Sequence, residues 1–124
     1  MNKLFILLLM IFCHIIDDYR LQGILANMKQ KLWWPQQERY TDKYKYDYLV
    51  ALVTHSFSWA FMIMLPIAAK NGFNVGLDFI VVLIVNMVVH GFIDDLKANK
   101  FKINLIQDQL IHIVQIVVTF LALV

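Results

Sequence analysis

The chain has 124 residues, of which 60% are hydrophobic and 16% charged, and its formal net charge is +2. The length fits one domain, and so small a net charge argues against nucleic acid as a partner. Globular proteins contain roughly half apolar residues, so this excess predicts an integral membrane protein instead of a water-soluble monomer. The single cysteine, Cys13, excludes an internal disulfide framework.

Four apolar segments follow one another along the chain and predict an all-α fold, an integral membrane four-helix bundle. A membrane span needs roughly 20 residues with few charges. We therefore expect one transmembrane domain over residues 1–124, with spans at about 3–18, 48–69, 75–94 and 105–124.

The first apolar segment has two interpretations. Its basic start at Lys3 and its apolar run resemble a signal peptide. Cleavage sites require small residues, whereas the residues before Cys13 are bulky, so we expect the segment to remain as a helix. That helix should continue past Asp18 towards Trp34, with residues 19–34 forming an amphipathic segment along the inner membrane surface.

Basic residues gather in two of the three connections between these segments. Loops rich in lysine and arginine stay in the cytoplasm. The sequence therefore predicts a multi-pass protein of the bacterial inner membrane with both termini outside the cytoplasm. The basic residues concerned are Lys29, Lys31, Arg39, Lys43 and Lys45, and then Lys97, Lys100 and Lys102.

Each predicted span carries one histidine, and three of these histidines have an aspartate four residues away. Residues four apart share a helix face, and the helical rise places all four histidines within about one turn of the same depth. Ionisable groups in membrane helices usually face the protein interior and mark function. We therefore expect one shared polar cluster. Its members are His14, His55, His90 and His112, with Asp18, Asp94 and Asp108.

Imidazole and carboxylate donors together suit zinc, manganese or iron. We predict that this cluster binds a divalent metal, with zinc first and manganese or iron as alternatives. Asp–His pairs also serve as proton relays or structural hydrogen bonds, so the spacing leaves the identity of the ligands open. The predicted metal ligands are His14, Asp18, His55, His90, Asp94, Asp108 and His112.

Three further charged residues lie beside these helical columns. Asp17 and Asp95 are rotated by about 100° from the columns, so we expect them to face solvent or lipid headgroups. Lys97 follows Asp94 by three residues and can pair with it or serve as a cytoplasmic anchor.

The order of these motifs resembles a family of small bacterial and phage membrane proteins catalogued as a domain of unknown function. The resemblance covers nearly the whole chain and implies a four-helix membrane protein, but no reaction. A looser analogy links it to membrane-bound metal-dependent hydrolases. The acids at Asp17 and Asp95 depart from the family pattern and offer a second candidate beside each liganding acid. The motifs are His14-x-x-x-Asp18-Tyr19-x-x-Gln22, the single His55, His90-x-x-x-Asp94-x-x-Lys97 and Asp108-Gln109-x-x-His112.

The leading functional hypothesis is a metal-dependent hydrolase that acts on a lipid or isoprenoid phosphate at the cytoplasmic leaflet. Asp18, Asp94 and Lys97 are the predicted catalytic residues, which transfer protons or hold a phosphate. The alternatives are a non-enzymatic channel, holin-like or accessory protein with a proton- or metal-responsive cluster, and a structural subunit of a larger partner. The expected partners are the lipid bilayer and a lipid-like substrate, with a homo-oligomer left open.

Overall fold

The computed structural model describes residues 2–124, and within them the chain is all-α, without strands. A π-helical turn prolongs the first helix, and short 3-10 turns lie in the connection that precedes the third. The all-α prediction is therefore confirmed. The helices are α1 (Lys3–Ile16), α2 (Leu25–Met28), α3 (Asp47–Lys70), α4 (Leu77–Ala98) and α5 (Leu105–Leu123); the π-helical turn is Asp17–Leu21, and the 3-10 turns are Trp34–Gln36 and Asp42–Tyr44.

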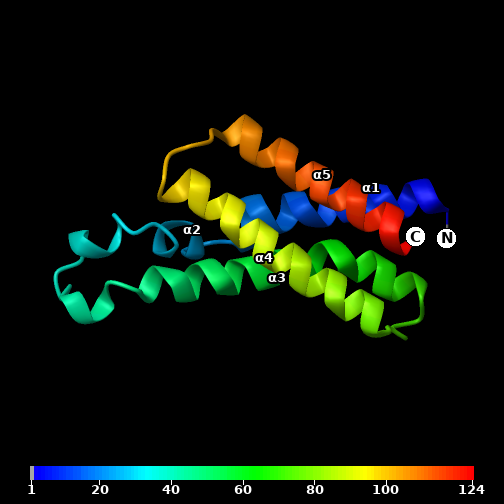
Figure 1. Cartoon of the computed structure of the whole chain (residues 1–124), viewed down its shortest axis with the longest axis horizontal. Helices are drawn as coiled ribbons and strands as arrows, with labels where there is room; N and C mark the ends of the chain where they lie inside the picture. The colour runs from blue at the N-terminus through cyan, green and yellow to red at the C-terminus, as the bar shows by residue number, and fades with distance from the viewer. Residues whose placement is uncertain (1) are drawn as a thin grey trace.

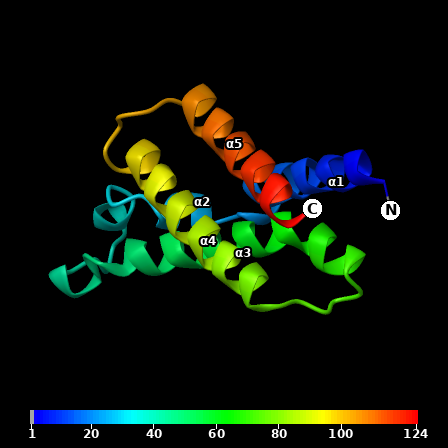
Figure 2. The same ribbon diagram turned by 45° about the vertical axis from the view of Figure 1, so that its right-hand side comes forward.

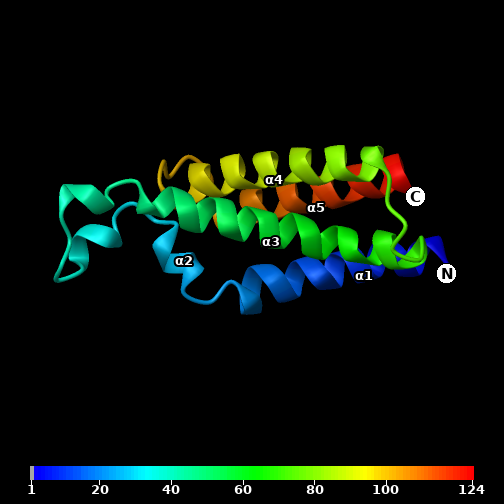
Figure 3. The same cartoon turned by 90° about the horizontal axis from the view of Figure 1, so that it is seen from below.

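The four longer helices lie side by side. Helix α3 packs against α1 and α4, and α5 packs against α1 and α4 (Figure 3). The two ends of the chain lie at the same end of the molecule, and the connections that carry most of the basic residues lie at the other (Figure 1). Seen after a 45° turn, α4 and α5 run at an angle to α1 (Figure 2).

Local signals explain where several helices begin and end. The side chain of Asn2 accepts a hydrogen bond from the backbone N–H of Leu4, 2.8 Å away, and so caps α1. Asn104 and Gln107 form a reciprocal capping box at the start of α5. Gly23 has φ +55°, a conformation that favours glycine, and the chain turns there. The predicted continuation of the first helix towards Trp34 is therefore wrong, and only the four-residue α2 forms beyond the turn.

Three helices, α3, α4 and α5, are long and apolar enough to cross a membrane. Helix α1 has 14 residues, which is shorter than a span requires, and the π-helical turn adds 5. The length and composition of the three longer helices indicate membrane association.

The outer surface of the helices is more apolar than that of a water-soluble protein. Large apolar side chains on every long helix face outward, for example Phe5, Val50, Val88 and Leu121, which are 52%, 69%, 64% and 74% exposed. Soluble proteins rarely expose continuous apolar surfaces of this kind. The interior contains a hydrophobic core that includes Trp59, Ile63 and Ile116. Beside this core, the following polar and charged side chains are buried: His14, Asp17, Lys29, His55, Ser56, Asn86, His90, Asp94, Asp108, His112, Gln115 and Thr119.

Helices α3 and α4 approach closely where Gly91 faces Ser56. A Cβ atom on Gly91 would lie 2.9 Å from Ser56 Oγ and 3.6 Å from Ser56 Cβ. Gly91→Ala should therefore destabilise the protein by about 1–3 kcal/mol, because the hydroxyl oxygen leaves no room for a methyl group. In a Ser56→Ala background the same change should become neutral or stabilise by up to about 1 kcal/mol, since alanine favours helix.

A double-mutant cycle of unfolding in detergent micelles measures this coupling. Additive effects of the two substitutions would show that Ser56 does not limit the approach of the helices.

Candidate metal centre

The four histidines converge on one buried point from four different helices. The rings of His90 and His112 stack with centroids 4.1 Å apart, and His55 lies 5.0 Å from His90. The ring of His14 lies 5.9 Å from that of His112. Helices α1, α3, α4 and α5 each supply one of these rings, and all four are buried. The structure thus brings together residues up to 98 positions apart.

Asp94 lies at the centre of this cluster. Its Oδ2 atom is 3.4 Å from His90 Nε2 and 3.5 Å from His55 Nε2, and its Oδ1 atom is 3.3 Å from His112 Nε2. The same Oδ2 atom accepts a 2.8 Å hydrogen bond from Lys29 Nζ. One carboxylate therefore contacts three histidines and a buried ammonium group.

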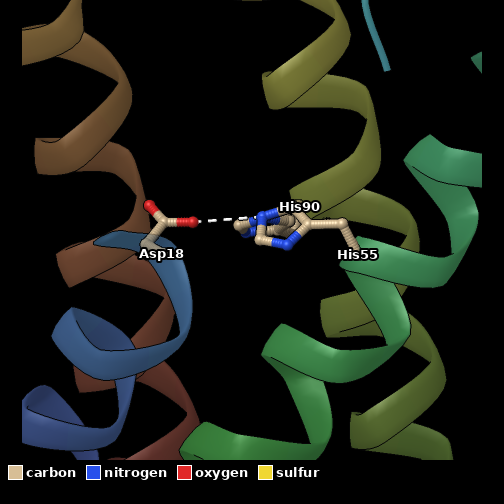
Figure 4. A group of neighbouring side chains, drawn as sticks. All are labelled: Asp18, His55 and His90. Carbon is tan, nitrogen blue, oxygen red and sulfur yellow. Dashed lines mark hydrogen bonds and ion pairs between the residues drawn. The ribbon is translucent and has the colours of Figure 1, made fainter. Parts of the chain in front are cut away.

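The other two predicted acids also lie close to the histidines. Asp18 Oδ1 is 3.1 Å from His55 Nε2, and Asp108 Oδ1 is 3.3 Å from His112 Nε2. Both carboxylates accept a hydrogen bond from Gln109 Nε2, at 2.9 and 3.0 Å. Figure 4 shows Asp18 facing the rings of His55 and His90 across the space between the helices.

These side chains form three groups in which the potential ligand atoms all lie within 4.8 Å of one another. The groups are Asp18, His55 and His90; His90, Asp94 and His112; and Asp18, Asp108 and His112. Because each group shares a member with the others, the donor set fits one divalent ion, or two ions held close together.

His90 has two ring nitrogens without a hydrogen-bond partner among residues 2–124, although the side chain is fully buried. The nearest carboxylate oxygen, Asp94 Oδ2 at 3.4 Å, is not in hydrogen-bonding geometry. Asp108 Oδ1 is also buried without such a partner. Buried polar atoms in native proteins almost always have partners. A cation in the cluster would bind to the free lone pairs of these nitrogen and oxygen atoms.

Both ring nitrogens of His14 have a hydrogen-bond partner on a neighbouring side chain, as those of His112 also do. The indole N–H of Trp59 donates to His14 Nδ1 at 2.8 Å, so His14 Nε2 carries the proton and donates to Gln109 Oε1 at 2.9 Å. Gln109 then donates to Asp18 and Asp108. His14 belongs to none of the three groups described above. The hydrogen bond from His14 orients the side chain of Gln109. The role of His14 as a metal ligand stays a prediction.

The structure corrects the expected orientation of Asp17. This residue is buried, accepts a 2.6 Å hydrogen bond from Ser58 Oγ, and has Oδ2 3.7 Å from His55 Nδ1. The wider π-helical turn that begins at Asp17 places Asp17 and Asp18 both towards the interior. Asp95 is partly exposed, and its Oδ1 atom accepts a hydrogen bond from Asn99.

Lys97 pairs with Asp108 instead of Asp94. Its Nζ atom lies 3.4 Å from Asp108 Oδ2, across the gap between α4 and α5. Asp94 is occupied by the histidines and by Lys29, so the pairing of Lys97 and Asp94 considered from their spacing does not form.

Lys29 is the functional candidate that the sequence did not reveal. Asn99 holds its backbone in place: Asn99 Nδ2 donates to Lys29 O at 3.0 Å, and Asn99 Oδ1 accepts from Lys31 N at 2.6 Å. The positive-inside pattern explained Lys29 as one loop lysine among several, and no helical spacing connects it with Asp94.

The cluster contains more negative than positive charge. Four carboxylates, Asp17, Asp18, Asp94 and Asp108, lie with two ammonium groups, Lys29 and Lys97. With neutral imidazoles, the cluster carries an excess of two negative charges. Uncompensated charge in a region shielded from water costs several kcal/mol per ion. A divalent cation, or two protonated histidines, would remove the excess.

The chain matches no protein-family model, no curated protein and no solved structure in our comparisons. The resemblance to the small bacterial and phage family therefore stays a prediction.

Trp59→Phe should release the ring of His14. The indole N–H fixes the His14 tautomer, and its loss leaves a buried nitrogen unsatisfied, which costs about 1–3 kcal/mol. Nitrogen NMR of labelled histidine should show His14 protonated at Nε2 in the wild type and mixed tautomers in the variant. Trp33→Phe is the matched control, because the ring of Trp33 packs on Trp34. An unchanged His14 signal in Trp59→Phe would contradict the assigned network.

Proposed function

We propose that this protein is a membrane-embedded four-helix metalloprotein that hydrolyses an amphipathic substrate at the cytoplasmic leaflet. The main support for metal binding comes from His90. Its buried ring nitrogens have no hydrogen-bond partner, although Asp94, His112 and His55 surround the ring. A buried imidazole whose nitrogens have no partner, and which is surrounded by other donors, has the properties of a metal ligand.

The outer surface supports insertion in a membrane. Three helices have the length and hydropathy of spans, and α1 with its π-helical turn supplies 14 and 5 residues, close to the length of a fourth. The connections that carry most of the basic residues lie at the end opposite both termini. By the positive-inside rule, this arrangement favours a multi-pass protein of the bacterial inner membrane with both termini outside.

The donor set supports a divalent ion held by His90 and His112 with Asp94, and by Asp18 and His55 where a second ion is present. Imidazole with carboxylate suits zinc first, then manganese or iron. One divalent ion also removes the excess of two negative charges in the cluster. A monovalent cation would neutralise only half of this excess negative charge.

A bound divalent ion supplies Lewis acidity and an activated water for hydrolysis. Asp18 or Asp94, whichever is not a ligand, takes the proton from the attacking water and returns it to the leaving oxygen of the broken ester bond. Lys97, whose side chain is 30% exposed, lies where it can neutralise an anionic group on the substrate.

An amphipathic substrate fits the surfaces that flank the cluster along α4. A groove of about 390 Å³ between α4 and α5 has mainly apolar walls, with Asn86 and Gln115 among its lining. Gln115 Oε1 lies 3.1 Å from His112 Nδ1, so the groove borders the cluster. On α4 the groove residues precede His90, whereas Lys97 follows it and lines a polar pocket. An acyl or prenyl chain in the groove would place a polar head at the cluster.

A proton relay is the second candidate, favoured by His112. Its Nε2 atom lies 3.3 Å from both Asp94 and Asp108, which is a suitable setting for an imidazolium ion. Proton flux in liposomes, lost in His112→Phe, would support this alternative over hydrolysis.

Purified wild-type protein should contain about one divalent ion per chain by elemental analysis. His90→Phe should abolish this metal, because phenylalanine keeps an aromatic ring stacked between Trp59 and His112 but offers no ligand nitrogen. Lys43→Ala, in the connection to α3, should leave the metal content unchanged. Wild-type protein that is folded and free of stoichiometric metal would end the metalloenzyme proposal and favour the proton relay.

Metal-loaded protein should release products from a phospholipid or polyprenyl phosphate, detected by mass spectrometry. Val114→Trp should lower turnover about tenfold or more while it keeps the metal, because Val114 lines the groove between α4 and α5. Leu110→Trp is the matched control on the same helix, since Leu110 is similarly exposed and does not line that groove. Full metal content without turnover on any lipid would count against hydrolysis.

A further inference from the structure

A polar pocket of about 310 Å³ lies where the α2 segment meets the end of α4. Lys29 and Lys97 both line it, together with Gln22, Gln30 and Phe101. Its lining contains no acidic side chain. The volume is about ten times that of a water molecule. The pocket can therefore hold a small anionic group.

Lys29 and Lys97 each connect this pocket with the cluster. Lys29 Nζ contacts Asp94 Oδ2 at 2.8 Å, and Lys97 Nζ contacts Asp108 Oδ2 at 3.4 Å. Both aspartates are potential ligands of a cation. A divalent ion bound by these two carboxylates withdraws negative charge from them, and so weakens their attraction for the two ammonium groups. The ammonium groups of Lys29 and Lys97 would then be available to bind an anion in the pocket.

The position of Lys29 is specified by the fold. Its side chain is buried, which for a lysine costs several kcal/mol unless it is paired. The side chain of Asn99, at the end of α4, binds the backbone at Lys29 O and, two residues further along the chain, at Lys31 N. Lys29 therefore differs from a solvated surface lysine, and its ammonium group stays at the border between pocket and cluster.

We propose that this pocket binds the phosphate group of the substrate through Lys29 and Lys97. The inference rests on the proposed function and specifies its substrate as a lipid that ends in a phosphate monoester. Two ammonium groups match the charge of a monoester dianion, whereas a zwitterionic headgroup would bring a cation towards both lysines. A phosphate from solution has the same chemistry without the apolar chain.

Calorimetric titration of purified protein in detergent tests this proposal with three probes. Dihexanoyl phosphatidic acid carries phosphate and tail, inorganic phosphate lacks the tail, and dihexanoylglycerol lacks the phosphate. Each is titrated into metal-free protein and into protein loaded with one equivalent of zinc, with excess zinc removed. Phosphatidic acid should bind most tightly of the three probes. Zinc should tighten its binding about tenfold, because the ion makes the two lysines available. By linkage, phosphatidic acid should raise the affinity for zinc by the same factor.

Lys29→Met and Lys97→Met should each weaken the binding of both phosphate probes about tenfold or more. Lys100→Met is the matched control: Lys100 pairs with Asp95 at 3.6 Å near the same end of α4 and does not line the pocket. If Lys29→Met does not fold, Lys97→Met decides the outcome, since its side chain is partly exposed.

Equal binding of phosphatidic acid and dihexanoylglycerol would overturn the proposal that the pocket binds phosphate. Phosphate binding that neither lysine substitution weakens would overturn it as well. Such a result with zinc still bound leaves the metal centre intact. Failure of zinc to bind, together with lysine-dependent phosphate binding to the metal-free protein, would instead retain the pocket and reject the metal. Binding of inorganic phosphate as tight as that of phosphatidic acid would overturn the assignment to a lipid.

Discussion

The balance of charge around Asp94 is the constraint on which the rest of this structure depends. This buried carboxylate contacts three histidines and Lys29, and it lies within helices whose outer faces are apolar. Its charge can be accommodated there only if positive charge is brought to it. The chain supplies Lys29 by folding the segment after Gly23 back against the end of α4, where Asn99 binds it.

The same constraint explains how the helices can associate if they lie in lipid. Apolar side chains then gain little by leaving a hydrocarbon environment, so close packing and polar contacts must hold the helices together. Gly91 allows α3 and α4 to approach at Ser56, beside His90 and His55 in the sequence. Gln109 joins α5 to the end of α1 through Asp18 and His14. The polar cluster is therefore a structural centre as well as a candidate site.

The sequence predicted the helices and the histidine cluster because both depend on periodicity. Apolar runs gave the long helices, and pairs such as His90 with Asp94 follow from one helical turn. Asp17 and Lys29 could not be predicted in this way. The orientation of Asp17 depends on a π-helical turn, and the position of Lys29 depends on hydrogen bonds with Asn99, 70 residues away in sequence. Neither contact follows from the spacing within one helix.

The charges of the cluster and of the pocket also suggest an order of binding for the proposed reaction. Without a cation, Lys29 and Lys97 neutralise carboxylates, and an anion would meet an excess of negative charge. A divalent ion removes this excess and releases both ammonium groups. A phosphate dianion then finds two positive charges without a partner, so each ligand improves the binding of the other. The ion should therefore bind before the lipid, because the site without the ion carries the excess of negative charge.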